Sequence, residues 1–367
     1  MDTSIRFALF LSTWVLAVGA GGVEPNVARA TVPVAVGNTA PAAKQPDWAS
    51  EPFLPRFSLS KATEYLDKGA HAHEKNCFAC HATFAYLAAR PAISAATPAH
   101  RAAWQALEEF AASLAAAKLS SKDTPPLRVS QVVMAAAVLA GHDAATGGKL
   151  HPLTRRALDR IWDLQREDGG WNWVKKGQPP SEIDDHFGVT TAAIGVGMAP
   201  DHYADTPRAR KGLDQIRHYL GVHPPTTIHQ RGMLLLAARY VEGLLTDAER
   251  KQSAADLFAL QRPDGGWAMA GLGDWRRADG TAQDRATSDG YGTGFAVYVL
   301  RRGGRIAADD SRLQQGVLWL QTHERARGCW FTRSPYKDDE RSTYVGTAYA
   351  ILALDACGQT GNGADRR

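Results

Sequence analysis

The stretch that decides the fold covers residues 165–198 and reads QREDGGWNWVKKGQPPSEIDDHFGVTTAAIGVGM. It predicts the end of one helix, a Gly-Gly-Trp turn, a polar loop ending in a paired acid, and the start of a second helix. The same order of features returns over residues 261–300, and a looser copy runs over 321–354 through Trp330. Repetition of a helix-turn-helix unit predicts a repeat architecture.

Amphipathic segments and apolar segments of small residues alternate along the rest of the chain. Helix starts are indicated by Thr-Pro pairs at 97–98 and 206–207 and by a capping box at Thr246 and Glu249. The expected pairs are 60–70 with 80–89, 98–114 with 129–141, 153–165 with 188–198, 207–220 with 228–245, 246–261 with 293–301, and 311–322 with 343–357.

The second helix of each pair is built almost entirely from Ala, Gly, Val, Leu, Thr and Tyr. Such a helix has no polar face and is expected to be buried all round. Six buried helices inside six amphipathic ones predict an all-α fold, a single (α/α)6 toroid of six helix pairs over residues 56–358. An open solenoid of helix pairs is the main alternative, although its inner helices would keep a more polar face.

The N-terminal residues have the pattern of an export signal. Residues 1–22 combine Arg6, an apolar run over 7–18 and small residues after it, which predicts a signal peptide and a secreted or periplasmic protein. An uncleaved anchor is the alternative. Residues 23–55 are rich in Ala, Pro and Val and predict a linker, and residues 359–367 predict a disordered tail. The net charge of +4, without a long basic run, gives no support to nucleic-acid binding.

Gln-x-x-Asp-Gly-Gly-Trp occurs at 165–171 and again at 261–267. It resembles the QW repeat of squalene-hopene cyclases and related terpene cyclases, whose toroid the protein prenyltransferase β subunits share. The resemblance covers residues 59–357 and implies the same toroid here. The Gly-Gly pair permits a tight helix end, and Gln and Trp are expected to tie neighbouring outer helices together.

The segment EIDDHFGVTTAAIGV, from Glu182, resembles the Asp-x-Asp-Asp motif at the start of an inner helix in class II terpene cyclases. The resemblance implies that Asp184 protonates an alkene or epoxide and that Asp185 supports it, although Glu182 replaces the first Asp. Two close carboxyls cannot both ionise cheaply, so one pKa is expected to rise. The expected activity is acid-initiated isomerisation or cyclisation of an isoprenoid. The alternative is that both acids cap the helix.

Cys77, Cys80 and His81 form a Cys-x-x-Cys-His motif, which is typical of covalent haem c attachment. His81 would be the proximal iron ligand. A redox or binding module that carries haem c is therefore an alternative function, and a Cys77–Cys80 disulfide or a chance metal site is the structural alternative. Candidates for the sixth iron ligand are His73, Met134, His186 and His229.

The inner helices of a toroid run in the same direction, so their N-termini share one rim. This mouth is expected to collect Cys80, His81, Asp184, Asp185, His186, residues 226–229 and Asp289, bordered by Trp171, Trp173, Trp267, Trp275 and Tyr291. We expect His186, Asp289, Tyr291 and the first three tryptophans to contact an isoprenoid-like ligand. His186 is an expected partner of the acids, a metal ligand or a hydrogen-bonding rim residue.

The same aromatic and acidic mouth also suits a glycan, with Asp184 and Asp289 as an acid/base pair. An apolar ligand makes peripheral contact with a membrane a further expectation.

The remaining cysteines, Cys329 and Cys357, are expected at opposite ends of a helix pair. About fourteen helical residues separate their levels by roughly 20 Å. A disulfide needs α-carbons within about 7 Å. Two unbridged thiols are therefore expected.

Overall fold

Helices account for all the regular secondary structure in the computed structural model, which describes residues 48–77, 81–93 and 96–361, with the backbone alone for 71–77 and 81. Over these ranges the fold is all-α, as expected. The β-type pairing within them consists of two isolated bridges, Phe53–Arg325 and Gln178–Glu182. The odd-numbered helices are α1 (Leu59–Cys77), α3 (Pro98–Ala116), α5 (Pro152–Asp163), α7 (Pro207–Val222), α9 (Asp247–Ala259) and α11 (Ser311–Thr322). The even-numbered helices are α2 (His81–Ala89), α4 (Pro126–Thr146), α6 (Asp185–Met198), α8 (Ile228–Ala237), α10 (Gly290–Arg302) and α12 (Asp339–Ala356).

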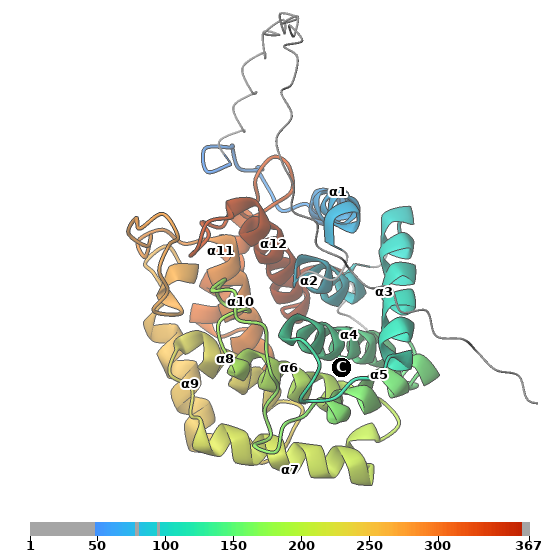
Figure 1. Ribbon diagram of the computed structural model, residues 1–367. Helices are drawn as coiled ribbons and strands as arrows, with labels where there is room; N and C mark the ends of the chain where they lie inside the picture. The colour runs from blue at the N-terminus through green and yellow to red at the C-terminus, as the bar shows by residue number, and fades with distance from the viewer. Residues whose placement is uncertain (1–47, 78–80, 94–95, 362–367) are drawn as a thin grey trace, which may run out of the picture. The chain divides into compact units, whose positions relative to one another are not determined.

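The even-numbered helices lie inside and the odd-numbered ones around them (Figure 1). Each even-numbered helix contacts the next one, and α12 contacts α2. Five of the odd-numbered helices also pack on the even-numbered helix that follows them, whereas α7 packs on the preceding α6. Short 3-10 helices at Arg90–Ala92, Tyr203–Asp205 and Met269–Gly271 join some of the elements.

The helix starts follow the capping residues of the sequence. Thr97 and Thr206 accept backbone hydrogen bonds ahead of a first-turn proline, and Thr246 with Glu249 forms a complete capping box. Each such cap contributes about 1 kcal/mol to helix stability. All twelve predicted helices are found in the described residues, with α1 and α4 longer and α8 shorter than expected.

Three turns with the same backbone follow α5, α9 and α11. In each, a glycine has a positive φ: 89° at Gly169, 88° at Gly265 and 89° at Gly328. A β-carbon on any of these glycines would collide with a carbonyl oxygen of another odd-numbered helix, that of Gln215 in α7, Gln315 in α11 and Lys61 in α1, respectively. The third turn therefore brings the end of the chain's last outer helix against its first.

The glutamine and tryptophan of the repeated motif hold these turns in place. Gln165 donates to carbonyls of Gly169 and Gly212, and Trp171 donates to the Ile161 carbonyl. Gln261 and Trp267 repeat these bonds two helix pairs later, donating to the carbonyls of Arg312 in α11 and Leu257 in α9. The expected tie between neighbouring outer helices is therefore present in both copies.

Both ends of the described chain are tied to the helices. Leu54 donates to the Glu324 carbonyl and Ala326 to the Pro52 carbonyl, so contacts begin within the segment expected to be a linker. At the other end Gln359 and Thr360 are hydrogen-bonded, whereas 362–367, like the expected signal at 1–22, lie outside the described residues.

Cys329 and Cys357 are both buried free thiols, which agrees with the helix geometry. Among the described helices, none combines the length and apolarity needed to cross a bilayer.

We predict that Gly328→Ala lowers the free energy of unfolding by about 2–4 kcal/mol, because the new methyl group meets both a left-handed backbone and the Lys61 carbonyl. Gly358→Ala is the matched control: its φ is 74°, but nothing lies within 4 Å of the added carbon. We expect a loss of about 1 kcal/mol there. Urea unfolding measures both, and equal losses would contradict a role for the contact with α1.

Candidate functional site

The N-terminal ends of four even-numbered helices meet through side-chain hydrogen bonds. Gln230 of α8 donates to Asp184 at the start of α6 over 2.9 Å. His229 of α8 lies 2.9 Å from the Tyr291 hydroxyl of α10. Arg341 of α12 donates to the Gln178 side chain, in the loop before α6, over 2.8 Å. These bonds place the two aspartate loops of the repeat at the same rim, as expected from helices that run in parallel.

Asp184 is the N-cap of α6. One carboxylate oxygen accepts the Phe187 N–H over 3.2 Å, and the other accepts from Gln230. The side chain is half-buried at the rim. Both of its oxygens are therefore engaged in positioning α6 against α8.

Asp185 lies between two cations. Arg166 approaches one oxygen within 2.8 Å and Lys175 the other within 2.7 Å, with the Asp185 side chain 12 % exposed. Arg166 also pairs with Asp168 of the turn after α5. The contacts of Asp185 thus link the rim to the outer turn.

Two buried histidines, His186 of α6 and His229 of α8, lie in the first turns of their helices. Burial lowers the pKa of His186 to about 4 and that of His229 to about 3, so both imidazoles are neutral at pH 7. His229 stacks on Phe295 with ring centroids 4.5 Å apart and is hydrogen-bonded to Tyr291. Neither ring nitrogen of His186 has a hydrogen-bond partner among the described residues.

Asp289 is the counterpart of Asp184 in the second repeat, yet it is fully enclosed. Its oxygens accept the Gly292 and Met269 N–H groups over 2.8 Å and 2.7 Å. Burial raises the pKa of Asp289 to about 7 in spite of these donors. Asp289 caps α10 from inside the protein and is only 5 % exposed, which leaves little of the access that a glycan would need.

The tryptophans expected at the mouth are interior residues. Trp171 and Trp267 are 0 % exposed and Trp173 is 1 % exposed. Trp173 packs on Phe187 and donates to the Ser181 carbonyl. Their rings stabilise the turns and offer no open face for a ligand to stack on.

A cavity of about 590 Å³ lies among the even-numbered helices. Its size is in the range of cavities that hold small-molecule ligands. Neither Asp184 nor Asp185 lines it. All six even-numbered helices contribute side chains to its mainly apolar wall, among them Phe84, Met134, Ile194, Met233, Tyr298 and Val345.

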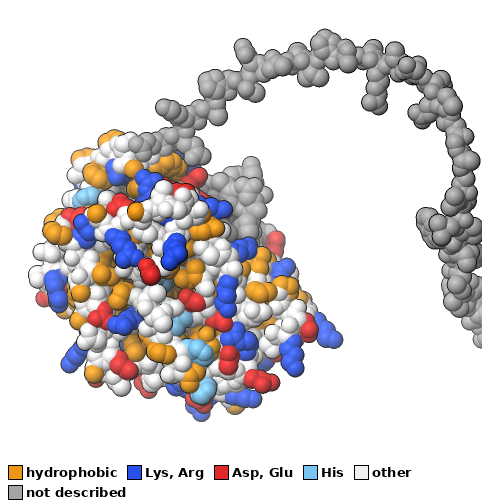
Figure 2. All heavy atoms as spheres, turned by 60° about the vertical axis from the view of Figure 1, so that its left-hand side comes forward, with side chains coloured by type: hydrophobic (Ala, Val, Ile, Leu, Met, Phe, Trp, Pro, Cys, Tyr) orange, Lys and Arg blue, Asp and Glu red, His pale blue; other side chains and the backbone are white. Residues whose placement is uncertain are grey.

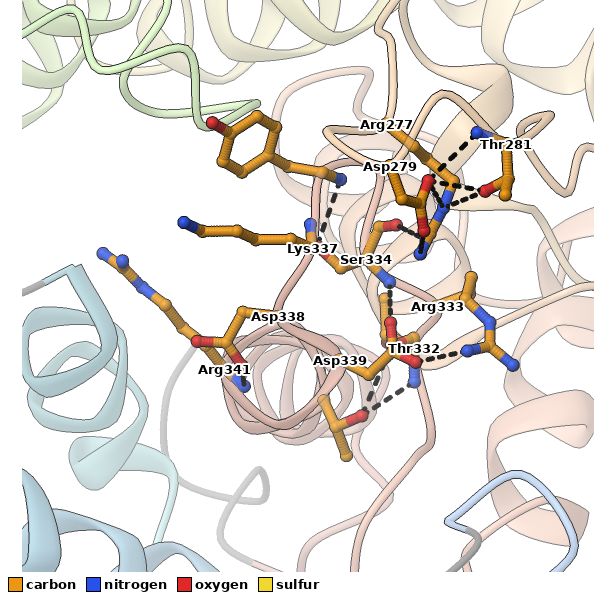
Figure 3. Close-up of polar contacts among 12 residues, drawn as sticks. Arg277, Asp279, Thr281, Thr332, Arg333, Ser334, Lys337, Asp338, Asp339 and Arg341 are labelled. Carbon is orange, nitrogen blue, oxygen red and sulfur yellow. Dashed lines mark hydrogen bonds and ion pairs between the residues drawn. The ribbon is translucent and has the colours of Figure 1, made fainter.

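Polar residues of two loops surround the cavity at the rim. Gln178 and Ser181 come from the loop before α6, and Ser334, Tyr336 and Asp338 from the loop before α12. Ser334 is fixed by Asp339 and by Arg277, which also holds Asp279, whereas the side chains of Lys337 and Arg341 extend away from that cluster (Figure 3). The face drawn in Figure 2 mixes both signs of charge with hydrophobic side chains and shows no single-sign field.

The cavity wall contains residues that sequence reasoning did not single out. Tyr291 was an expected contact, but Phe187, Tyr298 and Tyr349 were not. Tyr291 and Tyr298 are seven residues apart and therefore share one face of α10. The spacing of these two tyrosines on one helix face is the signal that could have found Tyr298.

The Cys-x-x-Cys-His motif gives no geometry for a haem site. Residues 78–80 lie outside the described residues, as do the side chains of Cys77 and His81. Within the part of the chain whose side chains are described, no three His, Cys, Asp or Glu residues are grouped as metal ligands.

A scan against models of protein families and a search of curated proteins both give no match to this chain.

Proposed function

We propose that the twelve helices form a single (α/α)6 toroid of the kind that the QW motif implies, similar to squalene cyclases and prenyltransferases. Two observations support closure of the ring. Helix α12 contacts α2, and the turn at Gly328 packs on Lys61 of α1. An open solenoid would leave its first and last pairs apart.

We further propose that the protein binds an elongated apolar ligand, isoprenoid-like in character, along the axis of this toroid. The apolar wall of the 590 Å³ cavity is the observation that carries the proposal. Burying a hydrocarbon against such a wall contributes roughly 25 cal/mol for each Å² of apolar surface removed from water. Glycan binding has less support, because the expected tryptophans are buried and the wall is mainly apolar.

Ile194→Trp tests the binding proposal. Ile194 faces the cavity from the middle of α6, so an indole there fills space that the ligand needs. We expect affinity for the hydrocarbon farnesene to fall more than about tenfold, measured by quenching of intrinsic fluorescence or by calorimetry. Leu318→Trp is the control, because Leu318 is 58 % exposed. Farnesene binding that is equally strong in both variants would exclude the axial cavity as the site.

Acid-initiated isomerisation or cyclisation is the catalytic form of the same proposal. Asp184 would give its proton to an alkene carbon, and the resulting cation would lose a proton elsewhere, so the reaction needs no external reductant or oxidant. Asp184 lies three residues before Phe187, which lines the cavity, and this proximity favours it over Asp185. The cap and ion-pair contacts of the two acids make ligand binding the better supported function.

Asp184→Asn separates turnover from binding. Asparagine also caps a helix well, so the fold and farnesene binding should persist within about twofold. Any isomerisation of a supplied isoprenoid should disappear, because the amide cannot donate the proton, and product analysis by gas chromatography measures this. Undiminished turnover in the variant would remove Asp184 as the acid.

Covalent haem c is the alternative role, supported by the Cys77, Cys80 and His81 motif alone. We expect protein matured in a periplasm to show a Soret absorption band that Cys77→Ala/Cys80→Ala abolishes. The Cys329→Ala variant is a control, since that thiol is buried elsewhere. A wild-type protein without a Soret band would contradict haem attachment.

A further inference from the structure

A polar cluster lies at the end of the cavity opposite the aspartate rim. Tyr298 and Arg302 belong to the last two turns of α10, Asp355 to the last turn of α12, and Tyr240 follows α8. All four line the same cavity. The cluster therefore lies at the C-terminal ends of these helices, whereas the aspartates cap their N-terminal ends.

The tyrosines form one wall that leads to this cluster. Tyr349 packs edge-on against Tyr291 and against Tyr298, with ring centroids 5.1 Å and 6.4 Å apart. Tyr291 is already hydrogen-bonded to His229. Among the described residues, the Tyr298 and Tyr240 hydroxyls have no hydrogen-bond partner from the protein. These two hydroxyls are therefore available to a ligand in the cavity.

Burial raises the pKa of Tyr298 well above its ordinary value, and Tyr240 adds to the shift while Arg302 opposes it. The phenol therefore keeps its proton at all ordinary pH values and is available as a hydrogen-bond donor. Tyr298 nevertheless retains partial surface exposure, which it owes to the cavity that it lines.

Arg302 and Asp355 add opposite charges to the cluster. Their nearest atoms are 4.0 Å apart, and the Asp355 side chain is 13 % exposed while that of Arg302 is 43 % exposed. Thr360 donates to one oxygen of Asp355 over 2.8 Å. The cluster accordingly has no net charge, with donors on Tyr298 and Arg302 and acceptor capacity on Asp355.

We propose that the ligand carries a hydroxyl group that binds among Tyr298, Arg302 and Asp355, while its apolar part extends along the cavity toward the rim. The proposal rests on the ligand-binding function proposed above and specifies its ligand as an isoprenoid alcohol. It also fixes the ligand's orientation, with the polar end away from Asp184.

The donors and acceptors of the cluster fit a hydroxyl better than other polar groups. A hydroxyl accepts from Tyr298 or Arg302 and donates to Asp355 at the same time. A carboxylate would lie beside the Asp355 charge, which repels it. A hydrocarbon would leave the Tyr298 hydroxyl without a partner in a buried site, which disfavours its binding there.

Farnesol, farnesene and farnesoic acid test the proposal in wild-type protein and in Tyr298→Phe. The variant removes one hydroxyl and keeps the ring, so the fold should persist. We expect farnesol affinity to fall about three- to tenfold in Tyr298→Phe, with farnesene affinity unchanged or slightly higher, as measured by calorimetry. Tyr336→Phe, at the opposite end of the same cavity, should change neither.

Asp355→Asn tests the charge. It should strengthen farnesoic acid binding at least about threefold and leave farnesene binding unchanged, because it removes the repelling carboxylate.

If Tyr298→Phe binds farnesol as well as wild type does, or if Tyr336→Phe alone weakens farnesol binding, the proposed orientation is wrong while ligand binding stands. Binding of neither farnesol nor farnesene to wild type would overturn the proposed function itself.

Discussion

The structure depends on a contact between a turn glycine and the backbone of another outer helix. Gly169, Gly265 and Gly328 each have a positive φ and leave no room for a side chain against the helix they touch. Glycine is the residue that adopts this backbone at no steric cost. Gly328 follows α11 and packs against Lys61 of α1, so the third of these turns also joins the last helix pair to the first.

Glycines also allow close contacts between the inner helices. A β-carbon on Gly195 of α6 would lie 2.7 Å from Ala137 of α4, and one on Gly294 of α10 would lie 2.6 Å from Ala350 of α12. Small residues on the flanks let neighbouring helices approach closely. Larger Met, Ile and Tyr side chains of these helices line the mainly apolar cavity between them, so the space is not completely filled.

The positions of the helices could be predicted from the sequence because they are determined locally. The twelve helices follow from apolar periodicity and from caps such as Thr97 and Thr246, whose effects lie within one turn of chain. It could not fix how each inner helix is rotated about its own axis, and that rotation decides whether an aromatic side chain faces the cavity or a neighbouring helix. Trp173, expected to contact the ligand, is therefore an interior residue, whereas Tyr298, for which the sequence predicted no role, lines the cavity.

The two ends of the cavity differ in how much freedom their polar groups have. At the aspartate rim, Asp184 and Asp289 each hold two hydrogen-bond donors, and Asp185 pairs with two cations. Removing any one of these acids from its contacts to serve a ligand would cost a helix cap or an ion pair, roughly 1 kcal/mol or more. At the opposite end the Tyr298 hydroxyl has no hydrogen-bond partner within residues 48–77, 81–93 and 96–361, so a ligand can bond to it without displacing any of these groups. A polar group of a ligand is therefore bound more easily at the C-terminal ends of the inner helices. The polar groups at the N-terminal ends are used to hold these helices in position against one another.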